Sequence, residues 1–203
     1  MKNQNEEKNP LAWEEVSCEH VISDEWMDLR KKAYRFPDGK VFSPFYNYSR
    51  RDYSVIVATD TEDRFICVQQ FRHGIEEVTT EFPAGGIERS GRTEYRKGHG
   101  GDIADSESAL AAARRELLEE TGYASDEWKP LIVIPSNASI ADNYAFIFRA
   151  KNCEKIGSQK LDATEFLNIV TYSQKELEAL ILSGGFQQAV HVMSYYLAKD
   201  RER

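Results

Sequence analysis

Long apolar runs are missing from this sequence. None approaches the roughly 20 consecutive apolar residues that a membrane-spanning helix needs. The first ten residues, MKNQNEEKNP, also lack the apolar core of a signal peptide. We therefore expect no membrane partner and a cytoplasmic location. Cysteine is scarce as well, and the three residues Cys18, Cys67 and Cys153 do not have the spacing of a metal site.

The sequence also lacks an excess of positive charge. The chain has 34 acidic and 26 basic residues and a formal net charge of −8. A protein that binds nucleic acid non-specifically needs a basic face, so we expect no nucleic-acid partner. An anionic phosphate compound is still compatible with this charge if metal ions and local arginines provide the attraction.

The length of 203 residues fits one sizeable domain with a small appendage. We divide the chain into a loose polar tail at 1–15, a small β subdomain at 16–50 and a larger domain at 51–203. The small subdomain contains an expected hairpin at 26–48, around the turn Pro37-Asp38-Gly39.

The larger domain contains both expected strands and expected helices. Apolar runs predict strands at 53–58, 64–70, 131–135, 144–149 and 166–172. Helices are expected at 106–121, from Ser173 to about Gly184, and from 186 or 187 to about 199. Strands on both sides of the first helix predict a mixed α/β fold in which helices pack on a mixed sheet.

The most informative segment of the chain runs from 101 to 123, GDIADSESALAAARRELLEETGY. Ser106 or Asp105 would cap the N-terminus of its helix, and Gly122 suits the position that ends it. The alanine-rich run between these residues favours helix. The segment therefore predicts a helix with well-defined ends.

Three glutamates on this helix are candidate metal ligands. Glu116, Glu119 and Glu120 are spaced i, i+3 and i+4, so their carboxylates crowd one face. A hard cation such as Mg²⁺ prefers oxygen ligands and usually binds together with substrate phosphates. The alternative for an isolated ExxEE pattern is a solvated acidic face, but the surrounding glycines, arginine and Glu107 favour the metal site.

The complete pattern resembles the signature of Nudix hydrolases. It consists of Gly101, Glu107, Arg115, Glu116, Glu119, Glu120 and Gly122. The resemblance implies an α/β/α sandwich and a Mg²⁺ cofactor, for which Mn²⁺ can substitute. It makes Glu116 and Glu120 metal ligands, with Glu119 sharing or supporting the metal ions. Arg115 would pair with Glu107 and orient the helix rather than take part in the chemistry.

Two shorter segments resemble the ADP-ribose (ADP-sugar) pyrophosphatase branch of that family. They are QFRHG at 70–74 and EFPAGGIE at 81–88. This resemblance makes the Ala84 carbonyl a further metal ligand. The first fifty residues resemble the small N-terminal β subdomain of the branch, which implies a homodimer.

Four residues are candidate substrate ligands: Arg72, Glu81, Arg51 and Asn143. Arg72 follows an expected strand and could donate charge-assisted hydrogen bonds to a phosphate, although a surface salt bridge is the alternative. Asn143 could contact the substrate or shape a turn.

The segment 89–104 is an insertion relative to that branch. In the relatives the Ala-Gly pair leads into the glutamate helix with five intervening residues, whereas 21 residues separate Gly85 from Glu107 here, 16 more than the pattern. We therefore expect Gly85, rather than Gly101, to be the structural glycine. The inserted loop is basic and glycine-rich, so it could be a substrate-binding lid, although a surface excursion is favoured.

A glutamate late in the chain could activate water. In the resemblance to the ADP-ribose enzymes, Glu165 takes this position, as a metal ligand or as the base. Glu119 or Glu120 could serve instead, because the base must lie within hydrogen-bond reach of the water. The candidate catalytic residues are thus Glu120, Glu119 and Glu165.

The predicted function is Mg²⁺-dependent hydrolysis of the diphosphate bond in a nucleoside diphosphate linked to another moiety. The resemblance favours ADP-ribose, which would give AMP and ribose 5-phosphate. Alternatives are another nucleotide sugar or dinucleotide and, in a different class, a non-catalytic domain that senses a nucleotide.

Overall fold

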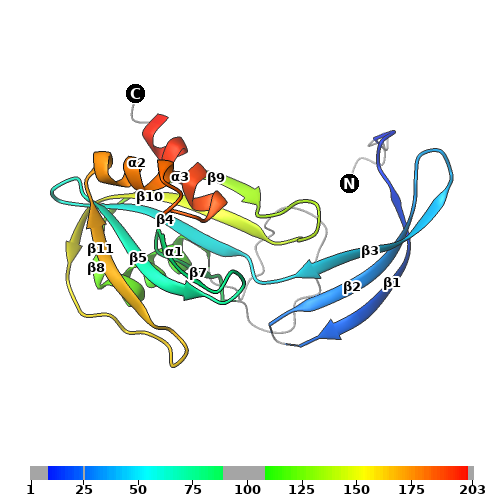
Figure 1. Cartoon of the computed structure of the whole chain (residues 1–203), viewed down its shortest axis with the longest axis horizontal. Helices are drawn as coiled ribbons and strands as arrows, with labels where there is room; N and C mark the ends of the chain where they lie inside the picture. The colour runs from blue at the N-terminus through cyan, green and yellow to red at the C-terminus, as the bar shows by residue number, and fades with distance from the viewer. Residues whose placement is uncertain (1–8, 25, 89–107, 201–203) are drawn as a thin grey trace, which may run out of the picture. The chain divides into compact units, whose positions relative to one another are not determined.

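The computed structural model describes three stretches of the chain, 9–24, 26–88 and 108–200. The chain forms two compact units (Figure 1). Unit 1 consists of Met1–Arg50 with Asn137–Asn143, and unit 2 consists of Arg51–Ser136 with Tyr144–Arg203. None of the described helices is long and apolar enough to cross a membrane.

Unit 1 contains a three-stranded antiparallel sheet in the order β1-β2-β3 (Figure 1). Its strands are β1 (Glu14–Ser23), β2 (Asp28–Arg35) and β3 (Val41–Ser49). The β2–β3 hairpin confirms the one predicted at 26–48. β1 was not predicted, and it begins inside the segment expected as a loose tail. All residues of β1 are exposed, so its sequence has no buried apolar face that would reveal a strand.

The segment 137–143 belongs to unit 1 although it lies far along the chain. Its backbone pairs with the end of β3. Arg30 Nη2 donates to Asp142 Oδ2 over 2.6 Å, although Arg30 is a buried residue. Ser49 Oγ donates to the same oxygen over 2.5 Å. Asp142 therefore provides the acceptor for a buried arginine of β2.

Unit 2 contains a mixed eight-stranded sheet. Its central order is β11-β5-β4-β10-β8, with β6 beside β5, β7 beside β4 and β9 beside β10. Only β4 and β10 pair in parallel among the described strands. The strands are β4 (Tyr53–Asp60), β5 (Phe65–Arg72), β6 (Glu77–Glu81), β7 (Ala84–Gly86), β8 (Tyr123–Ala124), β9 (Glu127–Pro135), β10 (Tyr144–Lys155) and β11 (Leu167–Tyr172). Each of the five runs predicted as strands is confirmed, within a few residues at the ends.

The described helices cover both faces of this sheet. They are α1 (Ala109–Thr121), α2 (Gln174–Leu182) and α3 (Ala189–Asp200). Alternate residues of β4 reveal the layers, because side chains alternate between the faces of a strand. Val55 and Val57 pack in a cluster with α2 and α3, whereas Ile56 and Ala58 pack in a cluster with α1. The predicted α/β/α sandwich is therefore confirmed.

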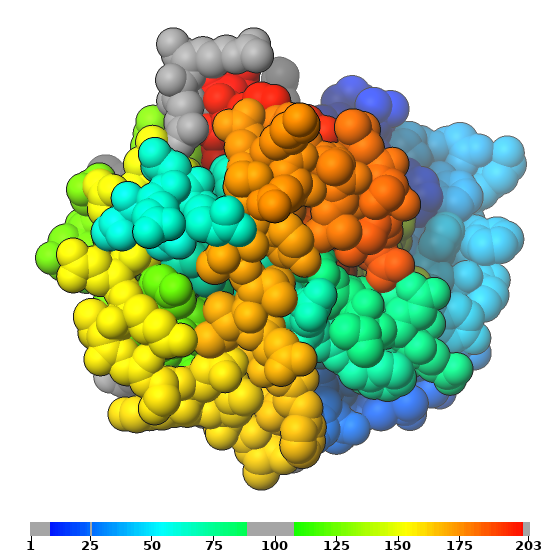
Figure 2. Space-filling view, turned by 60° about the vertical axis from the view of Figure 1, so that its left-hand side comes forward, coloured from blue at the N-terminus to red at the C-terminus, as the bar shows by residue number. Residues whose placement is uncertain are grey.

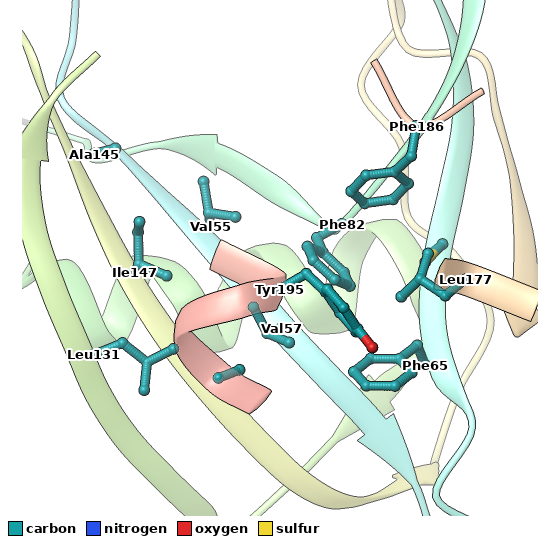
Figure 3. Close-up of a cluster of buried hydrophobic side chains, with 12 residues drawn as sticks. Val55, Val57, Phe65, Phe82, Leu131, Ala145, Ile147, Leu177, Phe186 and Tyr195 are labelled. Carbon is teal, nitrogen blue, oxygen red and sulfur yellow. The ribbon is translucent and has the colours of Figure 1, made fainter. Parts of the chain in front are cut away.

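Aromatic side chains fill the core between the sheet and the α2–α3 layer (Figure 3). The ring of Phe82 lies 5.1 Å from that of Phe186 and 6.3 Å from that of Phe65, centroid to centroid. Phe82 is fully buried and comes from the connection between β6 and β7. Burying such a ring stabilises the fold by about 1.5–3 kcal/mol, so this core anchors the chain just before β7.

The helix boundaries differ from the predicted ones by a few residues. α1 begins at Ala109, and its N-cap is Ser108, whose hydroxyl accepts a backbone N–H of the first turn over 3.1 Å. Ser106 or Asp105 was the predicted cap, so this prediction was wrong. Serine is a good cap at several of these positions, and the sequence alone does not rank them. Ser173 and Glu176 form a capping box at the start of α2, where a helix was predicted, and α3 begins at Ala189.

Candidate active site

The C-terminal half of α1 lies against the short strand β7. Ala84 N donates to Glu120 Oε2 over 3.0 Å. At the other end of the strand, Arg115 Nη2 donates to Gly86 O over 3.0 Å. Two side chains of the helix therefore bind the backbone at both ends of β7 and fix its position.

Gly85, between these two contacts, faces the carboxylate of Glu116. A Cβ atom built on Gly85 would lie 1.9 Å from Glu116 Cδ, which is far inside van der Waals contact. Only glycine therefore allows the buried Glu116 carboxylate to rest on the β7 backbone. This supports Gly85 as the structural glycine of the site. Gly101 lies outside the described residues.

The two buried carboxylates have raised pKa values. Burial raises the pKa of Glu116 to about 7, although the adjacent Arg115 acts in the opposite direction. Burial, together with the neighbouring Glu116, raises the pKa of Glu120 well above its ordinary value. Both shifts show that the protein alone disfavours two negative charges here. A cation between the carboxylates would reverse them.

The donor set of this site fits Mg²⁺. Glu116 and Glu120 offer carboxylate oxygens that are buried beside the backbone of Ala84. Mg²⁺ usually binds through one or two carboxylates, with water and substrate phosphates as the other ligands. Among residues 9–24, 26–88 and 108–200, no cluster of three or more His, Cys, Asp or Glu side chains could hold a metal ion. The two carboxylates therefore suit a divalent cation whose other ligands are water and, once a substrate binds, phosphate oxygens.

Arg115 connects the glutamates to one another. Its Nη1 donates to Glu116 Oε1 over 2.8 Å and to Glu119 Oε2 over 3.0 Å. Glu119 is more exposed than the other two glutamates of α1, with 41% of its side chain accessible. Arg115 thus orients one buried and one exposed carboxylate. Glu107, its predicted partner, lies outside the described residues.

Arg72, at the end of β5, forms a two-bond ion pair with Glu81. Arg72 Nε and Nη2 donate to the two oxygens of Glu81, each over 2.8 Å. Thr79 Oγ1 also donates to Glu81 Oε1 over 2.8 Å. The Glu81 side chain is 0% exposed, whereas that of Arg72 is 37% exposed. Glu81 therefore fixes the guanidinium from the buried side and leaves its other edge open.

Glu165 lies in the segment 156–166 between β10 and β11, which is at the surface of unit 2 (Figure 2). Asp162 N donates to Glu165 Oε2 over 3.0 Å, which closes a short turn. After burial, the charge of Glu165 is among the causes of the raised pKa values of Glu116 and Glu120. The fold therefore brings Glu165 towards the α1 glutamates.

Hydrogen bonds tie this segment to the end of α1. Lys160 N donates to Glu119 O over 2.8 Å, and Gln159 Nε2 donates to Glu120 O over 2.8 Å. Gln159 was missed by the sequence analysis. It belongs to no motif, and its partner is a backbone carbonyl 39 residues away in the sequence, so no signal in the sequence singles it out.

Two other predicted substrate residues have different surroundings. Arg51 is exposed, and its Cδ lies 3.7 Å from a Cβ built on Gly86, so its stem runs beside β7. Asn143 is buried and belongs to unit 1. The structure therefore brings Arg51, but not Asn143, together with the α1–β7 site in one compact unit.

Comparison with known protein families identifies the chain. A model described as the NUDIX domain matches residues 49–185. The chain belongs to the Nudix family. The matched range includes α1, β7 and Glu165. The resemblance found in the sequence is confirmed.

Several characterised proteins are similar to this Nudix chain. An ADP-ribose pyrophosphatase of Bacillus subtilis (strain 168) is 25% identical over 169 residues, which are 83% of this chain and 82% of that protein. A methanol dehydrogenase activator of Bacillus methanolicus is 27% identical over 79% of this chain and 78% of its own length. An ADP-sugar pyrophosphatase of Mus musculus is 33% identical over 55% of this chain and 49% of its own length.

A solved structure has the same fold as this Nudix chain. The crystal structure of an ADP compounds hydrolase matches 93% of this chain and 92% of its own, with a TM-score of 0.76 and 20% sequence identity. At that identity the likeness establishes the fold alone, and it confirms the predicted Nudix sandwich.

Proposed function

We propose that this Nudix protein hydrolyses the diphosphate bond of a nucleoside diphosphate linked to another moiety, with ADP-ribose as its substrate. Water would add to one phosphorus, giving AMP and ribose 5-phosphate. The observation that carries the proposal is the packing of two buried carboxylates, Glu116 and Glu120, on the backbone of β7. The names of the Bacillus subtilis and Mus musculus relatives support the ADP-ribose and ADP-sugar class.

The proposed cofactor is Mg²⁺, with Mn²⁺ able to replace it. Glu116, Glu120 and the carbonyl of Ala84 would hold the ion, and Glu119 would support it from the exposed side. When bound, such an ion neutralises diphosphate charge and activates water. Arg115 keeps two of these carboxylates oriented before the substrate arrives.

We assign the role of water activator to Glu165. Glu120 Oε2 already accepts from Ala84 N, and Glu116 Oε1 accepts from Arg115. Glu165 is half-buried on a surface segment and is one of the charges that act on the α1 glutamates. It therefore has the access that a base for water requires. Glu119, which is partly exposed, is the second candidate.

Arg72 is the proposed phosphate ligand. Its Nε and Nη2 are held by Glu81, so the Nη1 edge can donate to a phosphate oxygen. We assign Glu81, which has no exposed side-chain surface, the orientation of Arg72 in place of the direct substrate contact predicted from the sequence. Arg51 would provide a second cation from the exposed side of Gly86.

Two alternatives have separate support. Another nucleotide sugar would use the same carboxylates and arginine, since the diphosphate is the shared group. Regulation of a partner enzyme is supported by the name of the Bacillus methanolicus relative. The retained carboxylates Glu116 and Glu120 favour hydrolysis over a purely regulatory role.

A substrate panel tests the proposal. Purified protein with Mg²⁺ should release AMP from ADP-ribose, measured by chromatography beside other nucleotide sugars, dinucleotides and a nucleoside triphosphate. Glu120→Gln should abolish turnover while an amide oxygen still accepts from Ala84 N. Glu62→Gln, an exposed glutamate after β4, is the matched control and should retain full activity. No metal-dependent turnover of any compound would refute the proposal, and turnover of another compound would replace ADP-ribose.

The resemblance also leads us to propose a homodimer formed through unit 1, in a cytoplasmic protein. Light scattering coupled to size-exclusion chromatography should give twice the 23.3 kDa mass of the chain. A monomer at micromolar concentration would contradict the proposed dimer.

A further inference from the structure

His191 connects α3 to the chain between β6 and β7. Its side chain lies in the core, and the residue is only 4% exposed. His191 Nδ1 accepts from Phe82 N over 3.1 Å, which places the proton of the neutral ring on Nε2. Nε2 lies 3.9 Å from Glu81 Oε2. One imidazole therefore faces two consecutive residues of the connection.

The connection that His191 holds leads directly into the site. Phe82 N donates to His191, and the next residue, Pro83, accepts a backbone N–H of β4 over 2.9 Å. Ala84 N then donates to Glu120 over 3.0 Å. Three consecutive residues are thus fixed by three different elements, α3, β4 and α1. His191 is the contribution of α3.

Packing alone does not account for a histidine at this position. The imidazole lies nearly parallel to the ring of Phe82, at an interplanar angle of 8°, and edge-on to Phe186. A phenylalanine could make the same kind of ring contacts. It would leave the buried Phe82 N–H without an acceptor, however, and an unmade buried hydrogen bond is costly. The feature that distinguishes His191 is therefore the Nδ1 acceptor.

We propose that His191 is a positioning residue of the active site, which fixes the segment 81–84 through the Phe82 N–H. It thereby holds the Ala84 carbonyl towards the α1 glutamates and keeps Glu81 in place beneath Arg72. The inference rests on the proposed function, because Ala84 and Arg72 have their roles only there.

Three substitutions of His191 distinguish the contributions of its two nitrogen atoms from that of its ring. His191→Asn keeps an oxygen acceptor near the position of Nδ1, and His191→Gln keeps a polar group near the position of Nε2. His191→Phe keeps a planar aromatic ring, of somewhat greater volume, and removes both nitrogens. If the Nδ1 acceptor matters, the asparagine variant should behave most like the wild type, and the other two should resemble each other.

The decisive measurement is Mn²⁺ binding without substrate, followed by electron paramagnetic resonance. Loss of a residue that orients a metal ligand typically weakens metal affinity 10–100-fold, so we expect about a tenfold rise in the Mn²⁺ dissociation constant for His191→Phe and His191→Gln. His191→Asn should restore most of the affinity. KM for ADP-ribose should rise in the same two variants, because Arg72 loses its fixed partner. A role in core packing alone would lower the melting temperature without changing either constant.

The outcomes are separable from those of the proposed function. Wild-type Mn²⁺ affinity and KM in folded His191→Phe would overturn the inference and leave hydrolysis intact. If His191→Phe does not fold, equal Mn²⁺ affinities of the asparagine and glutamine variants would overturn it. If the wild type turns over no substrate, the proposed function fails, and the ranking of Mn²⁺ affinities still decides the role of His191. Wild-type protein that binds no Mn²⁺ would refute both.

Discussion

The two faces of the unit 2 sheet are covered by different kinds of side chain. On the α1 face, the helix packs its apolar residues near the middle of the sheet and places buried glutamates and an arginine on the backbone of β7. On the α2–α3 face, a larger cluster of aromatic and aliphatic side chains fills the interior (Figure 3). The first face carries the proposed active site at a cost in buried charge, and the second stabilises the fold.

The segment 81–86 belongs to both faces. Phe82 is anchored in the aromatic core, whereas Ala84 and Gly85 contact the carboxylates of α1. Ala84 packs against the same core as Phe82, whereas its backbone N–H donates to Glu120. A few residues therefore connect the two faces. Substitutions on the α1 face should mainly lower kcat/KM, whereas substitutions on the α2–α3 face should mainly lower the free energy of unfolding.

The largest effect is expected for Gly85→Ala, which breaks the α1 face. The new Cβ would meet the Glu116 carboxyl at 1.9 Å, so either β7 or α1 must move. A displacement of about 1 Å in an active site can lower the rate by about 100-fold, and we expect at least this loss in kcat/KM. Gly74→Ala is the matched control, since nothing lies within 4 Å of its added Cβ. Equal activity of the two variants would contradict the proposed site.

Leu177→Ala should break the other face without touching the chemistry. Leu177 in α2 is fully buried, and removal of such a side chain costs about 2–5 kcal/mol in the free energy of unfolding. The kcat/KM of the folded protein should stay close to that of the wild type. Leu182→Ala, in the same helix but 81% exposed, should cost less than about 0.5 kcal/mol. Urea denaturation of both variants, together with an activity assay, measures the difference.

In metal-free protein, the two faces should respond to pH in opposite directions. Burial lowers the pKa of His191 from 6.5 to about 4. Between these values only the unfolded chain binds the proton, so stability falls as the pH falls. Burial raises the pKa of Glu116 from 4.5 to about 7. Between these values only the folded chain holds the proton, so stability falls as the pH rises.

Single substitutions separate these two contributions. Glu120, whose pKa is also raised, remains in both variants. Thermal unfolding between pH 4 and pH 7 should therefore show a more positive dependence of stability on pH in Glu116→Gln than in His191→Phe. The shift of His191 corresponds to about 3 kcal/mol across its window. Added Mg²⁺ should remove the contribution of Glu116, because a cation favours the ionised carboxylate. Parallel pH profiles for the two variants would show that the pKa shifts of Glu116 and His191 do not control the pH dependence of stability.

The smallest effect is expected at the start of α2. Ser173 and Glu176 form a reciprocal capping box, and loss of such a cap typically costs about 1 kcal/mol. Ser173→Ala should therefore lower the midpoint of urea denaturation slightly and leave kcat/KM unchanged. Ser158→Ala, at an exposed position, should leave both unchanged. If Ser173→Ala lowered the free energy of unfolding by several times this amount, the loss of the cap alone would not explain the effect.

The sequence predicted the elements whose signals are local. An alanine-rich run with a serine before it and Gly122 after it predicts α1, and the pair Ser173 and Glu176 marks the start of α2. β1 was missed because every one of its residues is exposed. The Glu116, Glu119 and Glu120 spacing indicated the site, since a helix places these residues on one face whatever surrounds it.

Contacts between distant residues could not be predicted in this way. The hydrogen bond from Phe82 to His191 joins residues 109 positions apart, and no pattern in either segment points to the other. The burial of Glu81 beneath Arg72 likewise depends on the packing of the whole layer. Pairings of this kind are determined by tertiary packing, which overrides local preference.

The 137–143 segment has a consequence for the order in which the protein can fold. During synthesis, the three strands of unit 1 emerge first, but the carboxylate that accepts a hydrogen bond from buried Arg30 belongs to Asp142, which emerges much later. The N-terminal sheet therefore cannot reach its final form until most of the chain has left the ribosome. For the same reason, a fragment that stops at Arg50 would lack part of its own unit. Any attempt to transplant this sheet onto another Nudix domain has to carry both pieces.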